Sequence, residues 1–314
     1  MSAYSSREAA MRAIIESARQ NEKIVLISPD SLLAARATPF KAEFPDRFVE
    51  VGIAEQAAVD IAAGLATTGL IPVVVTYAGF LTMRACEMIR TFVAYPKLNV
   101  KLVGLNGGML GGEREGVTHQ FYEDVGILRT MPGVKIITPA DGHQAYHGAR
   151  AMFEQEGPVY LRLGSGREPE VFDDSTPFAF GKAREVLRHG DDAAMFASGF
   201  VMDRAIEAAN QLHEEGIHVT LIDVSTIKPL DKDTVTEALQ RCGCAVTVED
   251  HNIYGALGSA ICETAAERHP CRVERVGLQD LYARSGHAAK LLDLYGLSVQ
   301  DMMDAVKRVM QETH

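Results

Sequence analysis

The sequence predicts an α/β protein of two domains, an N-terminal domain built on a parallel sheet and a smaller α/β domain after it. The 314 residues are too many for one typical domain and enough for two separate cores. Short apolar runs alternate with amphipathic segments, which is typical of buried parallel strands covered by helices on both faces. The alternation lapses once, in a stretch rich in Gly, Pro, Asp and Ser, and this lapse divides the chain.

The N-terminal domain is predicted to span residues 1–170. Its expected strands are apolar runs rich in β-branched residues, at 24–28, 48–51, 71–77, 100–105, 134–138 and 159–163. Its expected helices follow these runs and begin at Ala54, Leu81, Gln120 and Gly142. Residues 61–83 carry no charge, but glycines and a proline interrupt them, so we expect a helix end, a turn and a buried strand rather than a membrane span.

A linker is predicted at 171–188 and the second domain at 189–314. The second alternation is shorter than the first, with expected strands at 193–198, 217–224 and 245–250. Helices are expected to begin at Met202, Lys232 and Ala256. An amphipathic helix is expected at 298–310, near the C-terminus.

The composition excludes several classes of function. A net charge of −11 leaves no basic surface for a polyphosphate backbone, so nucleic acid is not an expected partner. The first residues contain no apolar stretch behind a basic flank, so no export signal is predicted and the expected compartment is the cytoplasm. No membrane partner is expected either.

Residues that could take part in catalysis or binding follow three successive predicted strands. Glu55 comes just after the turn at Gly52, and Tyr77 and Phe80 stand where the next strand gives way to a helix. A glycine-rich loop at 104–120 follows the third strand and ends close to His119, whose imidazole can titrate near neutrality. In open α/β sheets ligands bind at the carboxyl ends of the strands, so these side chains are expected to share one crevice.

Each of these residues also has an ordinary structural explanation. A glutamate in the first turn of a helix is favoured by the helix dipole, as Glu55 would be. Aromatic residues at strand ends more often belong to a core than to a ligand platform, and a lone histidine on a loop is usually solvated. Such residues are less expected by chance at three adjacent strand ends than at one. Their joint occurrence therefore favours a binding or catalytic site.

Short motifs in a fixed order resemble the pyrimidine-binding domain of transketolases, which depend on thiamine diphosphate. The motifs are GIAEQ at 52–56, TYAGF at 76–80, GMLGGEREGVTHQ at 108–120, TPAD at 138–141 and GPVYLRLG at 157–164. The stretch from Gly181 onward, with its motifs at 221–231 and 249–261, resembles the C-terminal domain of the same family. The resemblance covers nearly the whole chain.

The resemblance implies how the cofactor would be bound. Glu55 matches the glutamate that contacts N1′ of the aminopyrimidine, where a shared proton activates the cofactor. Tyr77 and Phe80 match aromatic residues around the pyrimidine ring, and Met83 stands in place of a third one. Asp30 matches an aspartate that lines the thiamine site, and a turn residue is an equally good explanation of it.

The resemblance also implies contacts with the substrate. His119 matches a histidine beside the reacting carbon, and Glu115 replaces the aspartate that commonly contacts the hydroxyl group of the acceptor. Arg7 matches an arginine that binds the sugar phosphate, although its place in an N-terminal helical pattern also suits a solvated charge.

The rest of the family's phosphate clamp departs from its usual pattern. The positions that commonly hold a serine, a histidine and an arginine hold Ala34, Gly107 and Ser165. Arg162 and Arg167 lie nearby in the sequence as possible substitutes. The anionic tail of the substrate is therefore expected to differ from the usual sugar phosphate, with a sulfonate among the possibilities.

The resemblance implies a second polypeptide as well. Transketolases bind magnesium and the diphosphate through a preceding domain with a Gly-Asp-Gly motif, and the nearest string here is Gly190-Asp191-Asp192, in the wrong context. We therefore expect an N-terminal-half transketolase subunit to carry that motif and hold most of the magnesium and diphosphate. Two such heterodimers would form an α2β2 heterotetramer, and this chain alone would be inactive.

The activity implied is transfer of a two-carbon ketol unit from an anionic ketose to an aldose. Two other thiamine enzymes remain open alternatives, the beta subunit of a 2-oxoacid dehydrogenase and a 1-deoxyxylulose phosphate synthase-like enzyme. A non-catalytic α/β subunit that has kept only the fold is a third. The retention of Glu55, Tyr77, Phe80 and His119 together argues against loss of the chemistry.

Overall fold

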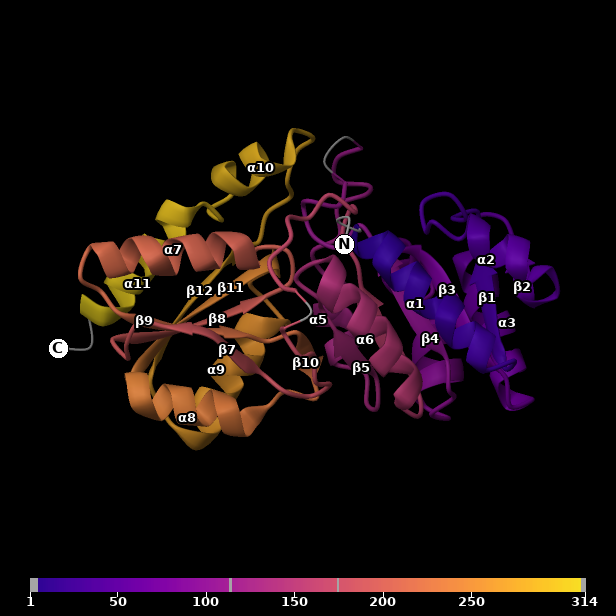
Figure 1. The fold of residues 1–314 in the computed structure, drawn as a ribbon, viewed down its shortest axis with the longest axis horizontal. Coiled ribbons are helices and arrows are strands. Elements are labelled where there is room, and N and C mark those ends of the chain that lie inside the picture. The colour runs from indigo at the N-terminus through magenta and orange to yellow at the C-terminus, as the bar shows by residue number, and fades with distance from the viewer. Residues whose placement is uncertain (1–4, 113–114, 174, 312–314) are drawn as a thin grey trace.

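The computed structural model describes residues 5–112, 115–173 and 175–311. The chain forms two lobes, each a sheet with helices on both sides (Figure 1), which confirms the predicted two-domain α/β fold. Within the described residues no helix combines the length and the apolar character needed to cross a membrane.

The first lobe contains a seven-stranded sheet in the order β10-β5-β6-β4-β3-β1-β2. Its six N-terminal strands are parallel: β1 (Ile24–Ser28), β2 (Phe48–Glu50), β3 (Ile71–Tyr77), β4 (Lys101–Leu105), β5 (Lys135–Ile137) and β6 (Val159–Arg162). The seventh strand, β10 (Thr226–Lys228), comes from the second half of the chain and pairs antiparallel with β5. The second half therefore completes the first sheet.

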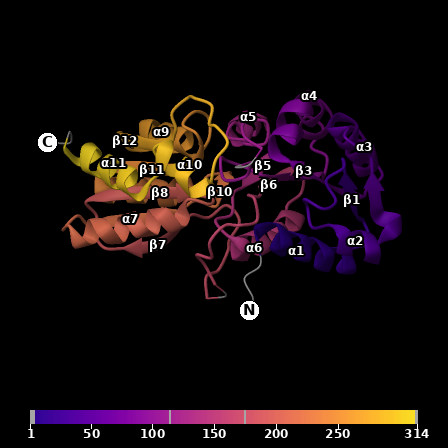
Figure 2. The same ribbon diagram turned by 90° about the horizontal axis from the view of Figure 1, so that it is seen from above.

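Helices cover both faces of this sheet because its strands are apolar on both faces. On β3, Val73 and Val75 pack toward α1 (Ser6–Gln20) and α6 (Gly142–Glu154), whereas Val74 packs toward α3 (Glu55–Thr67). Figure 2 shows the two helix layers on either side of the strands. The remaining elements are α2 (Thr38–Glu43), η1 (Pro45–Arg47), η2 (Phe80–Arg84), α4 (Cys86–Met88), η3 (Ile89–Ala94) and α5 (Asp124–Arg129).

The second lobe contains a five-stranded sheet in the order β12-β11-β8-β9-β7. Its strands are β7 (Arg184–Arg188), β8 (Ala193–Ser198), β9 (Val219–Asp223), β11 (Cys244–Asn252) and β12 (Arg272–Leu278). Only β7 pairs antiparallel, at the edge beside β9. In Figure 1, α7 (Met202–Glu214) and α11 (Val299–Gln311) lie above the sheet, and α8 (Lys232–Cys242) and α9 (Leu257–Arg268) lie below it. The short helix α10 (Ala288–Leu294) stands apart above α7.

Several elements differ from the prediction for identifiable reasons. The sequence did not predict β7, β10 and β12, because β10 is only three residues long and β7 and β12 are partly exposed strands that carry charged residues. The five residues of β7 lie inside the stretch expected as a linker. The helix expected from Leu81 begins instead as the π-helical segment η2. The helix expected from Gln120 begins only at Asp124, because Phe121 first pairs with Gly107 and Gly108.

The junction between the lobes is polar as well as apolar. The core beneath α3 continues into the core beneath α8 and α9, and Figure 2 shows β10, the edge strand of the first sheet, and α5 on the side of the first lobe that faces the second. Thr138 and Ser198 share a hydrogen bond of 2.5 Å between their hydroxyl oxygens. Asp223, at the end of β9, accepts a hydrogen bond from the amide of Gln144 at 2.5 Å, and burial raises the pKa of this aspartate to about 7.

Asp223→Asn is expected to stabilise the protein above neutral pH. Because the folded-state pKa of Asp223 exceeds its unfolded value, the charged carboxylate weakens the fold progressively as pH rises from about 4 toward 7. The neutral amide removes this effect, so the gain in unfolding free energy should be on the order of 1–3 kcal/mol at pH 8 and smaller at pH 5. Urea unfolding at both pH values measures it.

A matched control is Asp231→Asn. Burial acts to raise the pKa of Asp231, but hydrogen bonds from Thr234 and Ala183 and the charge of Lys182 together lower it, so its charge stabilises the fold equally at pH 5 and pH 8. The control should therefore lose similar stability at both values. Equal effects of Asp223→Asn at the two pH values would contradict the assignment of its raised pKa.

Candidate functional site

The candidate site lies at the carboxyl ends of β2, β3 and β4 in the first lobe. The chain leaves β2 through a turn at Gly52, whose φ of +69° suits glycine, and then begins α3 at Glu55. The carboxylate of Glu55 is buried, and Nη1 of Arg84 lies 3.2 and 3.3 Å from its two oxygens. A buried carboxylate at a strand end is the type of group that holds a proton or a cation.

Arg84 also stacks on an aromatic ring. Its guanidinium carbon is 3.7 Å from the centroid of the Phe80 ring, and about half of its side chain is exposed. The π-helical segment η2 places Phe80 and Arg84 on the same side of the chain. Arg84 was not among the residues selected from the sequence, although its spacing of four residues from Phe80 was a usable indication.

Aromatic rings form a compact group beside this ion pair. The ring centroid of His119 is 5.3 Å from that of Tyr77 and 5.2 Å from that of Phe80, and both pairs meet edge to face. Phe121 packs on Phe80 with centroids 5.3 Å apart, and its ring fills the space where a side chain on Gly79 would stand. The structure thus brings together Glu55 and the three ring-bearing residues that the sequence singled out, and it adds Phe121.

His119 stands on the return arm of the glycine-rich loop 104–120. Its Nδ1 lies 3.0 Å from the hydroxyl oxygen of Thr118, and its ring is only partly buried. The loop closes on itself at Gly108 and Phe121, which exchange two backbone hydrogen bonds. An imidazole held in this way can pass protons to a molecule that lies over the rings.

Arg7 is buried rather than solvated. Its guanidinium donates to the carbonyl of Gly164 at 2.9 Å, to the carbonyl of Ala34 at 3.3 Å and to the side-chain oxygen of Asn106. Burial lowers the pKa of Arg7, and the nearby positive charges of Arg36 and Arg167 act in the same direction. The alternative of a solvated charge on the N-terminal helix is therefore wrong.

Arg162 is engaged elsewhere and does not substitute in a phosphate clamp. It is buried at the end of β6 and forms an ion pair of 2.9 Å with Asp124. It also fills the space beside Gly107, where an added Cβ would lie 2.7 Å from its Cγ. A histidine at position 107 would therefore collide with Arg162 in this arrangement.

Asp30 and Glu115 lie at exposed turns. Asp30 adopts a left-handed conformation with φ of +56°, and its backbone N–H donates to Glu50 at 2.7 Å. Glu115 is exposed on the glycine-rich loop, next to Gly116. Met83 is also exposed, one residue before Arg84.

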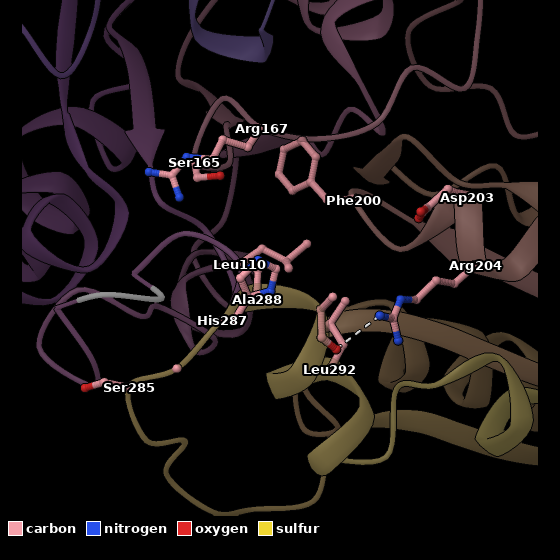
Figure 3. A pocket seen from close by; sticks show the side chains of 12 residues that line it. Leu110, Ser165, Arg167, Phe200, Asp203, Arg204, Ser285, His287, Ala288 and Leu292 are labelled. Atoms are coloured by element: carbon pink, nitrogen blue, oxygen red, sulfur yellow. Dashed lines mark hydrogen bonds between the residues drawn. The ribbon is translucent and has the colours of Figure 1, made fainter.

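An open cavity of about 970 Å³ lies between the two lobes, next to the glycine-rich loop 104–120. Figure 3 shows Ser165 and Arg167 on one side of it, with Asp203 and Arg204 of α7 on the other. Burial raises the pKa of Asp203. Leu110, from the glycine-rich loop, forms part of the wall, which connects the cavity to the loop that carries His119.

Known proteins resemble this chain over nearly its whole length. An apulose-4-phosphate transketolase subunit of Phocaeicola vulgatus is 35% identical over 292 residues, covering 93% of each chain. A 6-deoxy-6-sulfo-D-fructose transketolase subunit of Clostridium sp. strain MSTE9 is 33% identical over 303 residues, which are 96% of this chain and 94% of the relative. A solved split-gene transketolase, described as an inactive beta4 tetramer, superposes with a TM-score of 0.90 at 36% identity and covers 99% of this chain and 100% of its own.

The two halves of the chain also match separate domain families. The pyrimidine-binding domain of transketolase matches residues 2–167, and the C-terminal domain of transketolase matches residues 181–302. Both families agree with the resemblance found in the motifs. The chain therefore belongs to the transketolase family and is similar over nearly its whole length to subunits of split transketolases.

Proposed function

We propose that this chain is the subunit of a split transketolase that activates thiamine diphosphate for transfer of a two-carbon ketol unit from an anionic ketose to an aldose. The observation that carries the proposal is the contact of the buried Glu55 with the guanidinium of Arg84, a planar cation that stacks on the ring of Phe80. The similarity to transketolase subunits supports it.

The residues fit the aminopyrimidine of the cofactor. The guanidinium of Arg84 is planar, carries N–H donors, packs on Phe80 and donates to Glu55. A protonated aminopyrimidine is planar and carries N–H donors too, so it can make the same two contacts once the half-exposed Arg84 turns away. Tyr77, whose ring meets that of Phe80 edge to face, would contact the pyrimidine as well.

Thiamine diphosphate supplies a thiazolium carbon that attacks the ketose carbonyl and a ring that stores the electron pair when the adjacent C–C bond breaks. Glu55 holds a proton at N1′ of the pyrimidine in a site that its burial keeps away from water. His119 moves protons on the hydroxyl groups of donor and acceptor. Phe121 packs behind Phe80 and keeps that ring in place.

A partner subunit would complete this site. In the proposal an N-terminal-half subunit with a Gly-Asp-Gly motif holds magnesium and the diphosphate, in an α2β2 assembly. The split-gene transketolase described as an inactive tetramer of beta chains supports this dependence. Exposed apolar side chains beside Glu55, such as Ile53 and Met83, give a partner a surface to cover.

The substrate is proposed to carry an anionic tail at Arg7 and Arg167. Arg7 makes its side-chain hydrogen bonds to neutral acceptors, although the carboxylate of Glu168 lies near enough to favour its charged form, and its planar guanidinium suits an oxyanion. Relatives of this chain are named for a sulfonated and for a phosphorylated ketose, and both tails offer three oxygens to guanidinium groups. The longer Glu115 in place of an aspartate would alter contacts with the acceptor.

Glu55→Gln is expected to lower turnover at least ~100-fold in the complex with the partner subunit while cofactor binding persists, because the amide cannot hold the proton at N1′. A coupled ketol-transfer assay measures turnover, and calorimetry measures cofactor affinity. Glu87→Gln, an exposed glutamate three residues after Arg84, is the control and should keep full activity. Near-normal turnover in Glu55→Gln would rule out this role.

The isolated chain is expected to show no ketol transfer, and activity should appear when the partner subunit, thiamine diphosphate and magnesium are added together. Gel filtration of the mixture measures the assembly. Release of CO2 from pyruvate by the reconstituted pair would favour the two alternatives that decarboxylate 2-oxoacids, the dehydrogenase beta subunit and the 1-deoxyxylulose phosphate synthase-like enzyme. A pair that binds no cofactor would refute the proposed function.

Arg167→Gln is expected to raise KM for an anionic ketose about tenfold with little change in kcat, because it removes one charge-assisted contact to the tail. An uncharged ketose of the same length is the control substrate, and its KM should not change. Steady-state kinetics with both substrates measures the effect. A similar rise for both substrates would show that Arg167 does not bind the tail.

A further inference from the structure

The end of β11 reaches from the second domain beneath the glycine-rich loop of the first. The two arms of that loop meet at a neck, defined here as the backbone pairing of Gly108 with Phe121. Gly108 donates to Phe121 at 2.6 Å, and Phe121 donates back at 3.3 Å. His119 lies two residues from this neck, so the position of the neck sets the position of the imidazole.

We propose that Asp250 of β11 is a positioning residue that holds this neck, and through it His119 and Phe121, against Phe80. Its carboxylate oxygens accept hydrogen bonds from the backbone N–H groups of Met109 at 2.9 Å and of Leu110 at 3.3 Å. The mechanism proposed above gives Asp250 no part in ketol transfer. The role in catalysis rests on the proposed function, whereas the role in holding the loop does not.

The neck lies so close to the carboxylate of Asp250 that no side chain fits between them at Gly108. A Cβ on Gly108 would lie 2.0 Å from Oδ2 of Asp250, so only glycine permits the approach. Asp250 is 1% exposed. Two adjacent amides that converge on one carboxylate give charge-assisted hydrogen bonds, which are about twice as strong as neutral ones.

Arg162, from the first domain, binds both the neck and the end of β11. Its Nη2 donates to the backbone carbonyl of Phe121 and to that of Asp250, each at 3.0 Å. Burial raises the pKa of Asp250, and the same guanidinium and the two backbone amides offset part of that effect. One side chain of the first domain therefore joins the return arm of the loop to the end of β11.

The next residues of β11 extend the contact along the return arm. The backbone N–H of Asn252 donates to the carbonyl of Tyr122 at 2.8 Å. Nε2 of His251 accepts from the backbone N–H of Gly126 at 3.2 Å, so its Nδ1 donates to the carbonyl of Asn252 at 2.6 Å. Three consecutive residues of the second domain thus bind the neck and the chain that follows it.

Asp250→Asn tests the proposal, with Glu249→Gln as a matched control. Glu249 is the preceding residue on β11, is equally buried and also accepts two backbone N–H groups, from Leu257 at 2.8 Å and Gly258 at 2.7 Å, but these belong to α9. Asparagine keeps one acceptor oxygen and turns an NH2 group toward the second amide. Only the first variant should therefore release the loop.

Hydrogen exchange of the isolated chain is the first measurement. In Asp250→Asn the amides of Met109 and Leu110 should exchange on the order of tenfold faster than in the wild type. In Glu249→Gln they should not, and faster exchange should appear at the start of α9 instead. Equal exchange at Met109 and Leu110 in both variants and the wild type would overturn the proposal.

Kinetics of the complex with the partner subunit is the second measurement. In Asp250→Asn kcat/KM should fall 10- to 100-fold at nearly unchanged cofactor affinity, because the misplaced His119 serves the substrate and not the cofactor. Unchanged kcat/KM with released amides would overturn the catalytic part. A wild-type complex without ketol transfer would refute the proposed function, and the exchange measurement would still decide whether Asp250 holds the loop.

Gly108→Ala disturbs the same contact from the side of the loop. It is the alternative test variant if Asp250→Asn does not fold. Its new Cβ must displace the carboxylate of Asp250. Faster exchange at Met109 and Leu110 together with lower kcat/KM would support the proposal. Wild-type exchange at these amides in a folded Gly108→Ala protein would contradict it.

Discussion

The buried ion pair between Asp124 and Arg162 is the interaction on which the arrangement of the site depends. Asp124 begins α5, Arg162 ends β6, and the hydroxyl group of Tyr160 donates to the same carboxylate at 2.6 Å. Burial alone would raise the pKa of Asp124, but the guanidinium outweighs it and lowers that pKa. Loss of either partner of a buried pair typically costs about 3–5 kcal/mol, since the other charge stays buried and unpaired. The remaining donors of Arg162 then bind the loop and the second domain.

The same ion pair accounts for a departure from the family pattern. The resemblance placed a histidine of the usual phosphate clamp at Gly107, and the structure fills the space beside this glycine with the side chain of Arg162. A histidine there and the present position of Arg162 exclude each other. The missing clamp residue is thus part of a consistent local packing in which Arg162 occupies the space beside Gly107.

The sequence predicted the parts of the molecule that local pattern determines. Buried parallel strands give uninterrupted apolar runs, so β1, β3 and β8 were found with their full bounds, and Glu55, Tyr77, Phe80 and His119 were expected to meet at the strand ends. What depended on distant residues was not predicted. Arg84 acquires its role through its contact with Glu55, Arg162 through Asp124, and β10 is a strand because β5 offers it an edge. The roles of all these site residues in catalysis and binding stay predictions, those of Asp30 and Glu115 included.

The strand β10 has a consequence for how the chain acquires its structure during synthesis. The first sheet ends at β5 until residues 226–228 have left the ribosome, since among the described residues these form the strand that pairs with β5 at that edge. An uncovered strand edge pairs readily with other chains. Translation therefore passes through an interval in which a nearly finished domain still presents an open edge, and the interval ends when β10 pairs with β5. The second domain thereby covers one edge of the first sheet, which β2 bounds on the other side.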